Sequence, residues 1–369
     1  MHGGEHLRER IKRIFQDIDE SIDIILIKNA NEQIIDENFF YFTGLEKGLF
    51  EGCILLLYRD GRKKLVVSEL EADLTSNTDI QINIFKKKQD IIDFIESNIK
   101  SSTNIGLNFN RLSYNDYIFL KNTLKTTKFT DISKEILKTR SIKDDFEIDL
   151  IKKACNISDK VMNIIPSIVK EGMFEYELAA EIDYLMQKNG ADKPAFDTIS
   201  SFGRNTAYPH YTHGNSPLKK GDLIICDFGA NHNRYNSDIT RTFVFGNAST
   251  KQKRMHEIVF NAQKIGFDLI KQGVIAKDVH KSVEEYINKS EFKDHFIHST
   301  GHSLGLLVHD GNIGLNQSSE NKLLENMVLT VEPGIYVQEL GGIRIEDDVV
   351  VKKDGIELIT KPSRELIEI

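Results

Sequence analysis

The sequence predicts a two-domain protein of mixed helices and strands, an α/β (α+β) fold. Its 369 residues exceed what a single hydrophobic core usually spans. Short apolar runs bounded by turn residues predict strands in both halves, whereas a long helical periodicity begins only near residue 144. We therefore place the domain boundary near residue 140, which gives domains of 1–140 and 141–369.

The N-terminal domain is predicted to be a smaller α/β layer. Arg59-Asp60-Gly61 separates two apolar runs and predicts the turn of a hairpin. Ser113 is expected to cap the second of two helices. The predicted strands are residues 22–27, 53–58, 64–68 and 105–107, and the predicted helices are residues 89–100 and 113–125.

The C-terminal domain is predicted to begin with two helices and to end in strands. Apolar residues recur at helical spacing from residue 144, and Gly190 is a natural stop for the second helix. The predicted helices are residues 144–170, 174–189, 250–271 and 277–288. The predicted strands are residues 196–201, 223–229, 241–245, 327–331, 343–351 and 356–359.

Composition excludes several classes of protein. The formal charge of −8 argues against a nucleic-acid binder, which usually has a basic face. The apolar runs have strand length, so we expect no membrane span, and no apolar stretch follows the basic start Met1–Arg13 as a signal peptide would require. Cys53, Cys155 and Cys226 are scattered and odd in number, which favours reduced thiols in a cytoplasm.

Two aspartates form the strongest local motif. Asp227, in Asp227-Phe228-Gly229-Ala230, and Asp238, in Ser237-Asp238-Ile239-Thr240-Arg241, sit at the ends of strands separated by turn residues. A hairpin would bring the two carboxylates together, which is costly unless a cation lies between them. Ordinary turn aspartates stay an alternative for this pair alone. Cys226 should point to the opposite face of its strand, into the core.

Three histidines form a second cluster. His298, His302 and His309 fall within twelve positions, and Gly301 and Gly305 favour a loop rather than a helix. Neutral imidazole is a common metal ligand and can also act as an acid or base. Structural loop histidines are the alternative.

Two further carboxylates complete the candidate set. Glu332 ends an apolar strand just before Pro333-Gly334, and Glu346 lies in a strand-like Ile343-Arg344-Ile345-Glu346 segment. Strand alternation would put Arg344 on the face of Glu346, where it could hold that carboxylate in place. Each of these residues alone is more often structural than functional.

The combined set indicates a metal centre. Four carboxylates and one neutral histidine carry a charge of −4, which two divalent ions would balance, as in two-metal hydrolases. Oxygen-dominated ligands favour Mn, with Co or Zn as alternatives. The candidate ligands are Asp227, Asp238, His302, Glu332 and Glu346.

These motifs closely resemble the pita-bread metallopeptidases, which include methionine aminopeptidase, aminopeptidase P and prolidase. The resemblance implies that Asp227 binds one metal, that Asp238 and Glu346 bridge, and that His302 and Glu332 serve the second metal. It also implies that Glu332 is the general base. His210, in Tyr208-Pro209-His210, and His298 and His309 resemble the family's substrate-binding and catalytic histidines, beside Arg344.

The resemblance covers nearly the whole chain. Arg140-Ser141-Ile142-Lys143 with Glu147 resembles the opening of the catalytic domain, and Phe40–Gly44 resembles a signature of the creatinase/prolidase-like N-terminal domain. Three positions depart from the common pattern and leave the shape of the pocket open. They are Ser303, Leu307 and Asp310.

The leading hypothesis is a peptidase that cleaves after the residue preceding proline, as an Xaa-Pro aminopeptidase or an Xaa-Pro dipeptidase. Its expected partners are short proline-containing peptides and a second copy of the chain in a homodimer. A metal-free, creatinase-like amidinohydrolase and a non-catalytic binding protein are the alternatives, and retention of all five ligands disfavours both.

Overall fold

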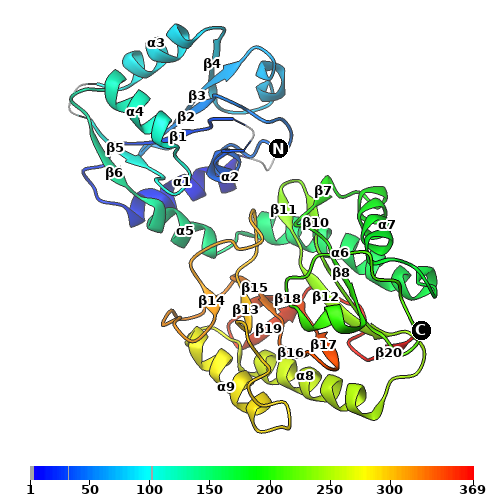
Figure 1. Ribbon diagram of the computed structural model, residues 1–369. Helices are drawn as coiled ribbons and strands as arrows, with labels where there is room; N and C mark the ends of the chain where they lie inside the picture. The colour runs from blue at the N-terminus through cyan, green and yellow to red at the C-terminus, as the bar shows by residue number, and fades with distance from the viewer. Residues whose placement is uncertain (1–3, 32, 101–102) are drawn as a thin grey trace. The chain divides into compact units, whose positions relative to one another are not determined.

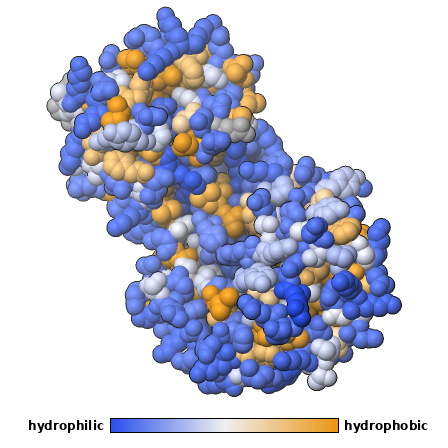
Figure 2. All heavy atoms as spheres, viewed as in Figure 1, coloured by the Kyte–Doolittle hydropathy of each residue, from blue (hydrophilic) through white to orange (hydrophobic). Residues whose placement is uncertain are grey.

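The computed structural model describes residues 4–31, 33–100 and 103–369, in two compact units, Met1–Arg140 and Ser141–Ile369 (Figure 1). Residues 1–3, which open the N-terminal segment, lie outside the described residues. Polar and charged side chains cover most of the face shown in Figure 2, with smaller apolar patches between them. Within the described ranges, no helix is both long enough and apolar enough to cross a membrane.

The first unit is built on a six-stranded mixed sheet of order β4-β3-β2-β1-β5-β6. β1, β2 and β3 are antiparallel neighbours, whereas β4, β5 and β6 join as parallel strands. The predicted hairpin is thus confirmed, because β2 pairs with β3. The strands are β1 (Ile24–Lys28), β2 (Ile54–Tyr58), β3 (Lys63–Ser68), β4 (Gln81–Phe85), β5 (Asn104–Leu107) and β6 (Lys128–Asp131).

Two helices cover one face of this sheet. α3 (Lys88–Asn98) and α4 (Tyr114–Thr123) contribute Phe94, Ile95 and Leu120 to a core with alternate residues of the central strands. Ser113 caps α4 as expected, since its hydroxyl accepts from the backbone N–H of Asp116. A 3₁₀ turn spans Ala72–Thr75, and α5 (Ser133–Ser141) ends the unit.

Besides α5, two further helices of the first unit were not predicted. α1 (Glu5–Asp17) buries Leu7, Ile11 and Ile14 at helical spacing within a run that looked mainly basic. α2 (Glu37–Thr43) begins at Asp36, whose carboxylate accepts from the Asn38 N–H. It ends at Gly44, which has a positive φ of 72° that glycine adopts readily.

Four long helices pack against the strands of the second unit (Figure 1). α6 and α7 pack against one face of the β20-β12-β9-β8 sheet, and α8 and α9 pack against the strands near the C-terminus. Asp144 caps α6, with Glu147 completing a capping box. The helices are α6 (Asp145–Ile168), α7 (Glu175–Lys188), α8 (Thr250–Leu269) and α9 (Ala276–Asn288).

The strands of this unit form five small sheets. The strands of the first two sheets are β8 (Ile199–Phe202), β9 (Leu223–Phe228), β12 (Ile239–Val244), β20 (Ile367–Glu368), β7 (Lys193–Pro194), β10 (Ala230–His232) and β11 (Tyr235–Asn236). The others are β13 (Gly301–His302), β14 (Gly314–Leu315), β15 (Val328–Val331), β16 (Gly334–Val337), β17 (Gly341–Arg344), β18 (Asp347–Lys352) and β19 (Gly355–Leu358).

The antiparallel pair β9 and β12 sets the position of the two aspartates. Thr240 lies opposite Asp227, and Asp238 immediately precedes β12, so both carboxylates come to the same end of the pair. Alternation along β9 sends Cys226 to the other face, where it is fully buried against α6 and α7. The prediction that Cys226 belongs to the core is confirmed.

One predicted strand was wrong. Residues 343–351 are not continuous, because β17 ends at Arg344 and β18 begins at Asp347 in a different sheet. β17 pairs with β16, whereas β18 lies between β15 and β19. Glu346 therefore lies in the bend between two strands, and the alternation assumed for Arg344 and Glu346 does not apply.

Candidate metal centre

Every predicted site residue lines one pocket of about 420 Å³ in the second unit. The five candidate ligands lie in or directly beside β9, β12, β13 and β15 and in the β17–β18 bend, and the segment between β8 and β9 supplies His210. Several apolar lining residues were not predicted. They are Phe196, Ile199, Pro209 and Val308.

Two aspartate oxygens in this pocket are buried without a hydrogen-bond partner among the described residues. They are Oδ1 of Asp227 and Oδ1 of Asp238. The other oxygen of Asp227 accepts from Arg344 Nη2. Burying an unsatisfied carboxylate oxygen is costly, so these two atoms indicate that a cation belongs beside them.

Arg344 acts on a different carboxylate from the one predicted. Its direct partner is Asp227, and it reaches Glu346 only through Thr240. Arg344 Nε donates to Thr240 Oγ1 at 3.0 Å, and Thr240 Oγ1 donates to Glu346 Oε2 at 2.5 Å. The predicted direct contact fails because the chain bends between β17 and β18.

His302 has the protonation and orientation of a metal ligand. Its Nδ1–H donates to the backbone carbonyl of Ser303 at 3.2 Å, and burial lowers its pKa, so the ring is neutral near pH 7. Its Nε2 lone pair then faces Asp238 Oδ2 at 3.6 Å and Glu332 Oε1 at 3.5 Å. These atoms repel one another unless a cation lies between them.

The carboxylates of the pocket are electrostatically strained without a counterion. Burial, followed by repulsion from Glu346 and Asp227, raises the pKa of Asp238 well above its ordinary value. Burial and repulsion from Glu332 do the same for Glu346. Burial raises the pKa of Glu332 to about 7. All three shifts show that the pocket disfavours its own negative charge.

These residues fit a divalent ion. One ligand atom from each of Asp238, His302 and Glu346 lies within 4.8 Å of the others. The unsatisfied oxygen of Asp227 and the carboxylate of Glu332 lie in the same pocket. Carboxylates combined with imidazole suit Mn, Co and Zn.

His298 and His309, two other histidines of the pocket, are neutral near pH 7. Burial lowers the pKa of His298 to about 3 and that of His309 to about 4. His298 Nδ1 donates to Ser299 O, and its Nε2 lies 2.9 Å from the Tyr336 hydroxyl. The His309 ring stacks on His302 with centroids 3.9 Å apart.

Sequence reasoning missed three hydroxyl groups that orient these side chains. Thr240 bonds Glu346, and Thr330 Oγ1 lies 3.2 Å from Glu332 Oε1 while accepting from the His302 N–H. Tyr336 receives a hydrogen bond from Arg344 at 2.8 Å. Thr240 lies within the quoted Ser237–Arg241 motif and Thr330 within the predicted strand 327–331, so their position near a candidate ligand was the available signal. Tyr336 had none.

The three departures from the common motif lie outside the pocket lining. Ser303 is buried, and its backbone N–H donates to Ile313 O. Asp310 is also buried, where it accepts from the Leu306 N–H and lies 3.7 Å from Lys143 Nζ. Leu307 does not line the pocket either.

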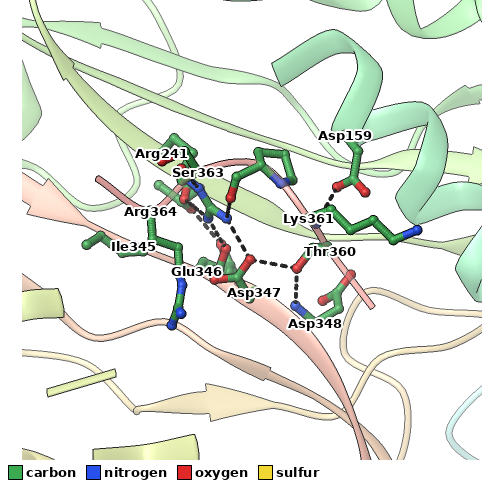
Figure 3. A network of polar contacts seen from close by, with 12 residues as sticks. Asp159, Arg241, Ile345, Glu346, Asp347, Asp348, Thr360, Lys361, Ser363 and Arg364 are labelled. Atoms are coloured by element: carbon green, nitrogen blue, oxygen red, sulfur yellow. Dashed lines mark hydrogen bonds and ion pairs between the residues drawn. The ribbon is translucent and has the colours of Figure 1, made fainter. Parts of the chain in front are cut away.

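A second set of buried polar groups lies next to the pocket (Figure 3). Arg241 places all five of its N–H donors, on Thr240 O, Glu346 O, Ser363 O, Pro362 O and Asp347 Oδ1. Asp347 also accepts from Thr360 and Gln263. This network fixes the backbone of Glu346 from the side away from the pocket.

The fold and this carboxylate-rich site define a metallopeptidase. The family sequence model of metallopeptidase family M24 matches residues 149–353 of this chain, and that of the creatinase/prolidase N-terminal domain matches residues 8–142. The chain belongs to family M24, and the predicted family and fold class are confirmed.

Individual relatives cover nearly the whole chain. A Xaa-Pro dipeptidase from Pyrococcus furiosus is 38% identical and covers 98% of this chain and 100% of its own length. The crystal structure of a prolidase from Pyrococcus horikoshii superposes with a TM-score of 0.87 at 36% identity, covering 98% of this chain and 100% of that chain. The crystal structure of an X-Pro aminopeptidase from Thermotoga maritima superposes with a TM-score of 0.88 at 32% identity, covering 95% of this chain and 100% of that chain.

Proposed function

We propose that this protein is a metal-dependent exopeptidase that hydrolyses the bond between an N-terminal residue and proline. The observation that carries the proposal is the pair of unsatisfied aspartate oxygens beside His302, Glu332 and Glu346 in one pocket. Relatives that align over nearly the full chain are named Xaa-Pro dipeptidase and X-Pro aminopeptidase. The two names differ in peptide length, not in the bond that is cleaved.

The five ligands would hold two divalent ions, which supply Lewis acidity toward the scissile carbonyl and a low-pKa water. They are Asp227, Asp238, His302, Glu332 and Glu346. Glu332 is proposed to accept the proton of the attacking water, and its carboxylate is oriented by Thr330.

The remaining polar residues would bind and orient the substrate. His210 and His309 line the pocket and are proposed to donate to the carbonyl oxygen as negative charge develops on it. His298 is held by Ser299 and Tyr336 and is proposed to contact the peptide next to Glu332. Arg344 holds Asp227 and so supports catalysis through a ligand.

Proline specificity would come from shape. The Xaa-Pro bond has no N–H, so the site cannot recognise it through that donor. Phe196, Ile199, Pro209 and Val308 supply an apolar lining against which a pyrrolidine ring can pack.

The decisive test is hydrolysis of Ala-Pro and Ala-Pro-Ala by protein reconstituted with Mn, Co or Zn. We expect release of alanine, and matched peptides with alanine in place of proline should react much more slowly. Absence of turnover with all three metals would refute the proposal. The relative rates of the two proline peptides separate dipeptidase from aminopeptidase action.

The proposal also covers the native metal ion, the oligomeric state, the cellular location and the domain boundary. We propose Mn as the native ion, a homodimer, and a cytoplasmic location, the last supported by three buried free cysteines. We also propose residues 1–140 as the creatinase/prolidase-like N-terminal domain and residues 141–369 as the catalytic domain. Elemental analysis, light scattering and cell fractionation test the first three.

A further inference from the structure

Glu175 is a buried carboxylate outside the pocket, at the first residue of α7. It is fully buried. A carboxyl group buried in this way needs several hydrogen-bond partners around it.

Four donors converge on Glu175, and all of them come from one segment of the chain. Oε1 accepts from the Phe202 N–H at 2.8 Å and from Asn205 Nδ2 at 2.9 Å. Oε2 accepts from the Gly214 N–H at 3.0 Å and from the Tyr211 hydroxyl at 3.3 Å. The carboxylate therefore ties the end of β8 to the first part of the segment that connects β8 to β9, as far as Gly214.

The helix backbone holds the same segment from the other direction. The N–H groups of Glu175 and Tyr176 donate to Ser216 O and Gly214 O. The space is closed tightly, since a Cβ added to Gly214 would lie 2.2 Å from the Tyr211 hydroxyl oxygen. A larger residue at position 214 would therefore displace the Tyr211 hydroxyl from its place beside Glu175.

His210 lies inside the loop that these contacts close. The Tyr208 N–H donates to Asn205 O, and the Tyr211 N–H donates to Tyr208 O, forming a turn with Pro209 and His210 at its centre. Asn205 and Tyr211, on either side of this turn, both bond Glu175. No described hydrogen bond holds the His210 ring itself, so its position depends on this backbone.

We propose that Glu175 is a positioning residue for His210 in the reaction. It sets the turn that presents the His210 imidazole to the substrate, although it does not line the pocket. The inference rests on the proposed peptidase function. It predicts that disturbing Glu175 impairs substrate binding and turnover through His210 while metal uptake is retained.

The test is a double-mutant cycle with metal-reconstituted protein and a Xaa-Pro peptide. Glu175→Gln places an amide N–H against groups that are themselves donors, so we expect kcat/KM to fall by roughly 10- to 100-fold, the range for a displaced catalytic group. Combined with His210→Ala, the same change should cost less than about 2-fold, because its effect passes through His210.

Matched variants keep the result interpretable. Glu177→Gln changes an exposed carboxylate in the same helical turn, which accepts only from the Phe174 N–H, and should leave kcat/KM unchanged. Tyr211→Phe removes one donor and keeps the ring, so it should give a smaller loss that also disappears with His210→Ala. Tyr211→Phe takes the place of Glu175→Gln as the test variant if Glu175→Gln does not fold.

The outcomes separate this inference from the proposed function. A wild-type protein without Xaa-Pro turnover refutes the function. With an active wild type, full activity of Glu175→Gln and Tyr211→Phe overturns the positioning role. Losses that multiply with that of His210→Ala, or that accompany loss of metal, also overturn it, because they indicate a general structural defect.

Discussion

Glu346 and Asp347 are consecutive buried acids with opposite surroundings. Asp347 is fully paired, by Arg241 at 2.6 Å and by a hydrogen bond from Thr360 (Figure 3), and it also accepts from Gln263. Glu346 faces the pocket, where burial, followed by repulsion from Glu332 and Asp227, raises its pKa although Arg344 acts in the opposite direction. A carboxylate that the protein pairs itself holds the fold together, whereas one that the protein leaves among like charges is arranged for a cation.

The largest expected effect comes from Asp238, another pocket carboxylate that lies among like charges. Asp238→Ala should abolish Xaa-Pro hydrolysis and weaken metal binding, while the stability of the metal-free protein holds or rises because one of several repelling charges is removed. Activity assays, calorimetric metal titration and urea unfolding measure the three properties. An active mutant that still binds its full complement of metal would contradict the assignment.

Loss of pairing at Asp347 should lower the stability of the metal-free protein, unlike Asp238→Ala. Arg241→Met leaves Asp347 buried without its cation, so we expect a loss of about 3 to 5 kcal/mol in the free energy of unfolding. Urea denaturation of metal-free protein measures this. Lys253→Met is the control, since it breaks the exposed Lys253–Glu368 pair and should leave stability close to wild type. Equal stability of the two variants would remove the distinction between the acids.

Asp348 directly follows the paired acid Asp347 and contacts the pocket residue Asp238. Its Oδ2 accepts from the Asp238 N–H at 2.9 Å and from the Cys155 thiol at 3.3 Å. Asp348→Ala should lower metal affinity by about 10- to 100-fold, the usual cost of removing a group that orients a ligand. Cys155→Ser retains a donor and should have a much smaller effect. Unchanged affinity in Asp348→Ala would show that Asp238 is held by other contacts.

The smallest expected effect concerns Asp159, a buried acid near the paired network. Burial raises its pKa to about 6, so the folded state favours its protonated form. Its contribution therefore destabilises the protein progressively as pH rises from about 4 to about 6, and stays constant above that range.

Asp159→Asn should remove this pH dependence. The expected gain near pH 7 is roughly 1 to 2 kcal/mol after solvent screening, and none is expected at pH 4. The amide oxygen can still accept from the Lys361 N–H. Urea unfolding at the two pH values measures the difference, and an equal effect at both would show that the pKa of Asp159 is not raised.

Much of the site could be predicted because its ligands sit at local signals. Asp227 and Asp238 flank a hairpin, and alternation separated Asp227 from Cys226 correctly. Glu346 and Arg344 show the limit of such reasoning. Their segment alternates like one strand, but its two halves pair with different partners, and pairing over long distances in the chain leaves no mark in local spacing.

Prediction of the fold likewise succeeded for some elements and failed for others. Apolar runs located the central strands, and the helices of the second unit matched closely because each has a long buried stripe. α2 was missed although Asp36 and Gly44 are good cap residues, because its seven residues are too few to show a helical period. The partners of Glu175 were beyond reach, since a buried glutamate in a helix looks like a surface one.

The central claim is that the unpaired pocket carboxylates are metal ligands of a peptidase. Its most direct test is calorimetric titration of metal-stripped protein with Mn, with Ala-Pro hydrolysis followed in the same samples. We predict uptake of about two ions per chain, with turnover appearing as they bind. Full turnover by the stripped protein in excess chelator, or no uptake of Mn, Co or Zn, would contradict the account.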